Sequence, residues 1–159
     1  MSKRNKLQKF AEILAYPHVI ENFDPRNPRL LGEHGLEVER KGKWAPEQFE
    51  NDHPITVELA CGRGEYTVAM ARENPARNFI GVDIKGARIW KGATIALEEG
   101  MKNVAFLRTR IEQLDLFFAE AEIDEMWITF PDPFPAKENR RLTSPRFIER
   151  YRKVLKPGG

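Results

Sequence analysis

The sequence contains very little cysteine. Cys61 is the single cysteine among 159 residues, so no internal disulfide can form, and nothing suggests an oxidising compartment. One cysteine and three scattered histidines also make a structural zinc site unlikely by composition. No histidine lies near Cys61 in sequence, so we interpret it as a small core residue and not as a nucleophile. We therefore expect a protein without disulfides or bound metal.

Long hydrophobic runs are also absent. No apolar run approaches the roughly 20 residues needed to span a bilayer, and we expect no membrane association. The basic N-terminal stretch "MSKRNKLQKF" is followed by no apolar segment of the kind found in signal peptides. A composition with 41% hydrophobic and 31% charged residues is typical of a soluble globular protein. We expect one domain-sized core and a cytoplasmic location.

Short apolar runs and helical patterns alternate from Ile55 onward. The runs predict strands over residues 55–60, 78–84, 103–109 and 125–130, and the patterns predict helices over 66–74, 87–100, 111–122 and 144–159. This alternation indicates an α/β fold with a doubly wound, mostly parallel sheet. Before it, we expect a helix over 5–15 and an irregular segment over 22–54, which divides the chain into residues 1–54 and a domain over 55–159.

The predicted sheet would end at its fourth strand, 125–130. A strand of such apolar character is typical of a sheet centre, and exposing it at an edge invites aggregation. We therefore expect this sequence to be part of a longer protein, with the domain truncated after the fourth strand and its helix.

A glycine turn follows the first of these strands in "VELACGRGEY". The dinucleotide fingerprint requires a third glycine where Thr67 stands, and the Gly-Lys-Ser/Thr of a P-loop is absent as well. What remains is Glu58 followed by Gly62 and Gly64, with Asp83 at the end of the next strand. An acid at that place typically binds ribose hydroxyls. The pattern favours a nucleoside site without a pyrophosphate cradle, as S-adenosylmethionine needs; the alternative is a tight turn beside an unrelated surface acid.

The stretch "WITFPDPFPAKENRR" brings an acid to the same edge of the sheet. Asp132 follows the fourth strand, and its flanking prolines restrict the backbone around it. Phe134 can stack on a base, and Lys137, Arg140 and Arg141 can contact phosphates. The alternative is a proline-rich loop with a helix-capping acid.

The net charge of +2 is unevenly distributed. Residues 1–10 carry four basic and no acidic side chains, and residues 137–159 carry eight basic and two acidic ones. Two basic ends around an acidic body suit a polyanionic partner, although solvated helix faces would look the same.

Residues 55–159 resemble the tRNA (guanine-N7-)-methyltransferase family, a Rossmann-like class of S-adenosylmethionine-dependent enzymes. The resemblance lies in "VELACGRGEY", "NFIGVDIKGAR", "ALEEGMKNVAFLRT", "FPDPFPAK" and "RRLTSPRFIERYRKVLKPGG", in that order. "FPDP" followed by "RRLT" is its most specific part. The segment "LQKFAEILAYPHVIENF" resembles the beginning of the family sequence less sharply.

The resemblance implies a set of site residues. Glu58 and Asp83 would contact the cofactor, Asp132 would lie between cofactor and target base, and Lys137 would lie near the substrate. The family usually has Asn or Asp beside the adenine after the third strand, where this sequence has Arg110, which can stack on or flank the ring. Glu112 can compensate for the missing acceptor. Ala60 also departs from the family, which commonly has glycine there.

The implied reaction is methyl transfer to N7 of a guanosine in the variable loop of tRNA. N7 carries a lone pair and no proton at neutral pH, so alignment is the main catalytic demand, and Asp132 can stabilise the positive charge that develops on the base. Segments 1–10 and 137–153 are the candidates for tRNA contact.

Two other interpretations remain open at this point. A methyltransferase acting on an exocyclic amine of a base would also carry an acid and prolines after the fourth strand. An RNA-binding module with a degenerate Rossmann-like core would explain Arg110 and the missing C-terminal part. Nucleoside mass spectrometry separates the first from N7 methylation, and cofactor titration separates the second.

Overall fold

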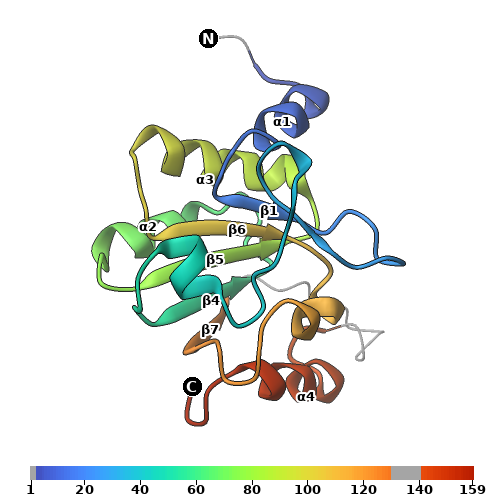
Figure 1. Ribbon diagram of the computed structural model, residues 1–159, viewed down its shortest axis with the longest axis vertical. Helices are drawn as coiled ribbons and strands as arrows, with labels where there is room; N and C mark the ends of the chain where they lie inside the picture. The colour runs from blue at the N-terminus through green and yellow to red at the C-terminus, as the bar shows by residue number, and fades with distance from the viewer. Residues whose placement is uncertain (1–2, 130–140) are drawn as a thin grey trace.

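The computed structural model describes residues 3–129 and 141–159. Over these residues the strands form one seven-stranded sheet in the order β3-β2-β1-β6-β5-β4-β7 (Figure 1). No helix of the described ranges is long and apolar enough to span a bilayer.

Four parallel strands form the part of the sheet that carries the site. They are β4 (Ile55–Leu59), β5 (Asn78–Asp83), β6 (Val104–Arg108) and β7 (Glu125–Ile128). β4 pairs in parallel with β5 and with β7, and β5 pairs in parallel with β6. All residues of β4 and β5 are buried, as expected for parallel strands covered on both faces. The four predicted strands and their parallel arrangement are confirmed.

Helices cover the two faces of this sheet separately (Figure 1). One face packs against α1 (Lys6–Ile13), α2 (Glu65–Glu73) and α3 (Gly86–Glu98) through a cluster that contains Phe79 and Phe106. The other face packs against η2 (Trp44–Phe49), η3 (Ile111–Leu116) and α4 (Pro145–Val154). The predicted helices over 5–15, 66–74 and 87–100 are confirmed. The helix predicted over 144–159 begins as expected, with Ser144 as N-cap and Pro145 as first residue, but it ends at Val154 because Leu155 is extended and pairs with Ile123.

The segment over 22–54 is more ordered than predicted. Just before it, β1 (Val19–Glu21) joins the sheet in parallel with β6. Within it, β2 (Leu30–Leu31) and β3 (Glu37–Val38) extend the sheet antiparallel, with the short 3-10 turn η1 (Glu33–Gly35) between them. The π-helical η2 then buries Trp44 completely. Strands of two or three residues are too short to show a periodicity of two, which is why this part of the prediction was wrong.

The predicted helix over 111–122 is also wrong beyond its first half, because only the 3-10 helix η3 forms there. Phe117 and Phe118 are both buried, and the Phe117 carbonyl accepts a hydrogen bond from Trp44 Nε1 at 2.8 Å. The Glu122 carboxylate accepts from the backbone N–H groups of Gly42, Trp44 and Ala119. The Phe117 carbonyl and the Glu122 carboxylate thus accept hydrogen bonds from residues 42–44, and these contacts replace the predicted second half of the helix.

Candidate functional site

The candidate site lies at the carboxyl ends of β4 and β5, where open α/β sheets bind their ligands. Glu58 lies near the end of β4 and Asp83 ends β5. The residues between β4 and α2 form the predicted glycine turn beside them. The structure therefore brings together Glu58, Gly62, Gly64 and Asp83 as the sequence predicts.

Glu58 is a buried carboxylate held by two hydroxyl groups. Its side chain belongs to a residue only 1% exposed. Oε1 accepts from Thr67 Oγ1 at 2.8 Å, and Oε2 accepts from Thr129 Oγ1 at 3.1 Å. Burial raises the pKa of Glu58, and the two hydroxyl donors oppose that rise. The two threonines come from α2 and from the end of β7, and no sequence pattern predicts either role.

The glycine turn uses left-handed backbone at three positions. Gly62 and Gly64 have φ of 59° and 73°, and Ala60 has φ of 54°. Glycine adopts such a φ without a steric penalty, whereas a side chain with Cβ is strained there. Ala60, the position at which the family commonly has glycine, therefore carries backbone strain in this chain.

The turn is packed tightly against α3. A Cβ added at Gly64 would lie 2.5 Å from Phe106 Cε1, and one added at Gly92 would lie 2.7 Å from the Arg63 carbonyl oxygen. Gly92 N donates a hydrogen bond to that same carbonyl at 2.7 Å. Gly92 lies in the interior of α3, where glycine is unfavourable. A glycine at such a position indicates a close contact, so the sequence alone could have predicted that the turn approaches α3 here.

Asp83 holds the other side of the turn. Its Oδ2 accepts from the Gly62 N–H and its Oδ1 accepts from the Lys85 N–H, both at 2.9 Å. The residue is 6% exposed. Both donors are backbone groups, so the carboxylate fixes the turn before α2 and the chain entering α3.

These residues fit an S-adenosylmethionine molecule. Each oxygen of a carboxylate can accept two hydrogen bonds, so Glu58 and Asp83 each keep capacity beyond their protein donors. Glycines in the turn let a ligand approach the backbone closely. Two carboxylates beside one turn also suit the positive sulfonium and ammonium groups of that cofactor.

Arg110 lies just beyond β6 at the same edge of the sheet. It is exposed and precedes η3 as its N-cap. The adjoining Thr109 is buried and donates its N–H to the Asp83 carbonyl at 3.1 Å. Asn22, which follows β1, donates to Thr109 Oγ1 and Gln113 Oε1. The loop that carries Arg110 is thus fixed by the N-terminal part of the chain.

Four of the predicted residues lie outside the described part of the chain, namely Asp132, Phe134, Lys137 and Arg140. Arg141 lies within it, four residues before the first residue of α4, and its carbonyl accepts a hydrogen bond from Ser144 N at 3.0 Å. The roles of all five remain predictions.

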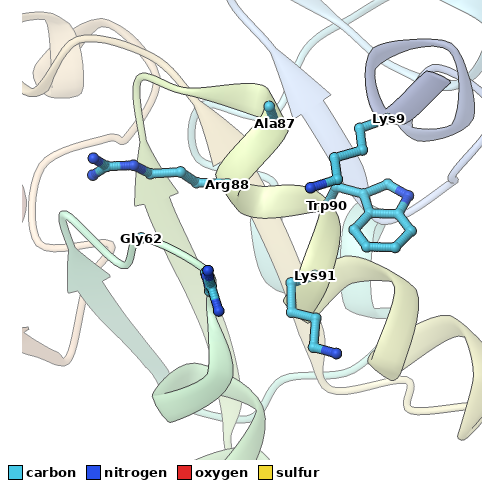
Figure 2. Close-up of a pocket in the computed structure, with 7 residues that line it drawn as sticks. Lys9, Gly62, Ala87, Arg88, Trp90 and Lys91 are labelled. Atoms are coloured by element: carbon cyan, nitrogen blue, oxygen red, sulfur yellow. The ribbon is translucent and has the colours of Figure 1, made fainter. Parts of the chain in front are cut away.

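A concavity with basic walls lies beside the turn (Figure 2). It has a volume of about 630 Å³ and is lined by Lys9, Gly62, Arg63, Ala87, Arg88, Trp90 and Lys91. Sequence analysis identified Gly62, as a residue of the glycine turn, and Lys9, as part of the basic segment 1–10. The others were missed because the cations come from α1, the turn and α3, and only folding brings them together.

Comparison with known proteins shows the family to which the chain belongs. A family model described as "Putative methyltransferase" matches residues 52–159. The tRNA (guanine-N(7)-)-methyltransferase of Bacteroides thetaiotaomicron is 55% identical over 98% of this chain and 60% of its own length. That of Christiangramia forsetii is 50% identical over 100% of this chain and 69% of its own length.

The fold also matches a solved structure. The antibiotic-resistance methyltransferase Kmr aligns with a TM-score of 0.63 and 18% identity, over 78% of this chain and 65% of that one. The predicted Rossmann-like methyltransferase fold is confirmed. The chain spans only 60% of the length of the Bacteroides relative.

Proposed function

This chain belongs to the tRNA (guanine-N7-)-methyltransferase family, and we propose that it methylates N7 of a guanosine in the variable loop of tRNA. The proposed methyl donor is S-adenosylmethionine, and the proposed location is the cytoplasm. The observation that carries the proposal is the glycine turn beside two buried carboxylates, Glu58 and Asp83, the second of which accepts a hydrogen bond from Gly62 N.

The turn would hold the cofactor, with Asp83 accepting from the ribose hydroxyls and Glu58 lying beneath the positive groups. Bound S-adenosylmethionine supplies a methyl group on a positively charged sulfur. Arg110, exposed at the same edge, can flank the adenine. A carboxylate in a desolvated place favours a cation more strongly than one in water.

The chain needs no general base for this chemistry, because guanine N7 has a free lone pair and carries no proton. The residues must instead align the base and stabilise the charge it gains. We assign the second task to Asp132, which the prolines around it restrict. Phe134 would stack on the base, and Lys137, Arg140 and Arg141 would contact tRNA phosphates.

The test is methylation of a tRNA transcript by the wild-type protein and by Asp132→Ala, read out by nucleoside mass spectrometry. We expect 7-methylguanosine from the wild type and none from the variant, whose circular dichroism spectrum should be unchanged. Turnover by the variant at the wild-type rate would contradict the role of Asp132. A product methylated on an exocyclic amine would contradict N7 as the target.

A further inference from the structure

The concavity beside the glycine turn carries four cationic side chains. Figure 2 shows Arg88 and Lys91 extending from α3 and Lys9 extending from α1. Arg63 completes the set from within the turn itself. Arg63, Arg88 and Lys91 are exposed, and Lys9 is half-buried. Together the four define what we call the basic concavity.

No carboxylate is among the residues that line the concavity. Over residues 3–129 and 141–159, none of the four cations forms an ion pair. A cation of the neighbouring helix α2 does, because Arg72 pairs with Glu99. A concave surface lined by charge of one sign concentrates ligands of the opposite sign.

The walls of the concavity are held in place by packing. Trp90 Nε1 donates to Glu12 Oε2 at 2.5 Å, and Lys9 Nζ lies 5.1 Å from the centroid of the Trp90 ring. A Cβ added at Gly86 would lie 2.7 Å from Phe10 Cε1, so α1 and α3 approach each other closely. Three of the cations therefore lie on two packed helices, and the fourth, Arg63, lies in the turn, where its carbonyl accepts a hydrogen bond from Gly92 N of α3.

The chemistry of the concavity differs from that of the cofactor site. The sulfonium and ammonium groups of S-adenosylmethionine need acids, which Glu58 and Asp83 supply. Two guanidinium and two ammonium groups instead suit the oxygens of phosphodiesters, which arginine binds in pairs and lysine binds as a point charge.

We propose that the basic concavity binds the phosphodiester backbone of the RNA substrate. The RNA would then cross the α1–α3 side of the glycine turn and reach the cofactor edge at Gly62, which lines the concavity and also donates to Asp83. This inference rests on the proposed function, because it takes tRNA as the substrate.

The test compares two double variants of the protein that lose the same charge. Arg88→Ala with Lys91→Ala removes two cations of the concavity. Lys41→Ala with Lys102→Ala removes two exposed lysines that do not line it. The affinity for a tRNA transcript is measured over a range of salt concentrations, and S-adenosylmethionine is titrated by calorimetry.

Removing two phosphate contacts should lower the slope of log K against log salt by about 1.4–1.8. At physiological salt this corresponds to roughly 10- to 30-fold weaker tRNA binding. KM for tRNA should rise in proportion with kcat unchanged, and the affinity for S-adenosylmethionine should equal that of the wild type. The Lys41 and Lys102 variant should keep the wild-type slope.

Equal slopes for the two double variants would overturn the inference. So would a loss of S-adenosylmethionine affinity as large as the loss for tRNA, since the concavity would then serve the cofactor. The binding measurement needs no turnover, so it decides the inference even if no 7-methylguanosine forms and the proposed function fails. A wild-type protein that does not bind tRNA would overturn both.

Discussion

Two substitutions of Glu58 distinguish the contribution of its hydrogen bonds to stability from the contribution of its negative charge. Glu58→Gln keeps the shape of the side chain and removes its charge, whereas Glu58→Ala removes both. In the native protein the carboxylate accepts from Thr67, which is 0% exposed, and from Thr129. A hydroxyl group can donate or accept, so a glutamine amide can replace both bonds by accepting from one threonine and donating to the other.

The two substitutions should therefore differ in the free energy of unfolding. Glu58→Gln should lie within about 1 kcal/mol of the wild type, because both hydrogen bonds survive. Glu58→Ala leaves the buried Thr67 hydroxyl without its acceptor, which costs about 1–3 kcal/mol, and it also opens a cavity. We expect a total loss of roughly 2–4 kcal/mol for the alanine variant.

The pH dependence gives an independent check. Folding raises the pKa of Glu58 because burial disfavours its charged form. The stability linked to its protonation is present below the ordinary glutamate pKa and is lost as the pH rises through the folded-state pKa. At neutral pH the wild type therefore bears the cost of a buried charge that Glu58→Gln lacks. The difference in the free energy of unfolding between the wild type and Glu58→Gln should shrink as the pH falls toward the ordinary glutamate pKa.

Urea denaturation of the three proteins between about pH 8 and about pH 5 measures these differences. Calorimetric titration should show that Glu58→Gln binds S-adenosylmethionine at least about ten-fold more weakly than the wild type does, because a charge-assisted contact is lost. An alanine variant as stable as the glutamine variant would refute the assigned hydrogen bonds. A wild-type-to-glutamine difference that does not change with pH would refute the raised pKa.

Three further predictions concern the glycine turn. Ala60→Gly should raise the free energy of unfolding by about 1 kcal/mol, because φ at this residue is 54°. Ala69→Gly, at an exposed position in α2, should lower it by about 1 kcal/mol in the same urea titration. Gly64→Ala should cost about 2–3 kcal/mol, because its Cβ would lie 2.5 Å from a buried aromatic ring. Gly100→Ala, also at positive φ but with no atom within 4 Å, should cost only about 1 kcal/mol; equal losses would contradict the packing argument. Burial and two neighbouring carboxylates raise the pKa of the Cys61 thiol, so iodoacetamide at about pH 8 should modify it far more slowly in the native protein than in urea.

The central part of the fold could be predicted because each of its elements has a complete local signal. The strands β4, β5 and β6 are apolar runs of five or six residues, and β4 and β5 are each followed by a turn and an amphipathic helix. The rule that ligands bind at the carboxyl edge then placed Glu58 and Asp83 together without any knowledge of distances.

The N-terminal part could not be predicted because its structure depends on distant partners. β1 has three residues and gains its conformation from β6, with Val19 paired to Phe106. Trp44 is buried by residues more than seventy positions later in the sequence, including Phe118 at a ring-centroid distance of 5.1 Å. Such long-range pairing leaves no periodicity in a short segment.

The hydrogen-bond donors to the buried carboxylate of Glu58 could not be predicted from the sequence either. Thr67 reads there as a departure from the dinucleotide fingerprint, and its hydroxyl instead satisfies Glu58. A small polar residue in a helix has many roles open to it, and only the folded arrangement, which brings Thr67 of α2 to Glu58, selects this one.

The glycine turn links the two proposed binding sites mechanically. Gly62 N donates to Asp83, and the next residue, Arg63, accepts from Gly92 N through its carbonyl while its side chain lines the basic concavity. The turn is thus held from β5 on one side and from α3 on the other. The same few residues thus connect Asp83, the proposed cofactor ligand, with Arg63, a proposed RNA contact, so the position of one constrains the position of the other. Alignment of a target base with a methyl donor is the main demand of the proposed reaction, and a turn held from both sides would contribute to that alignment.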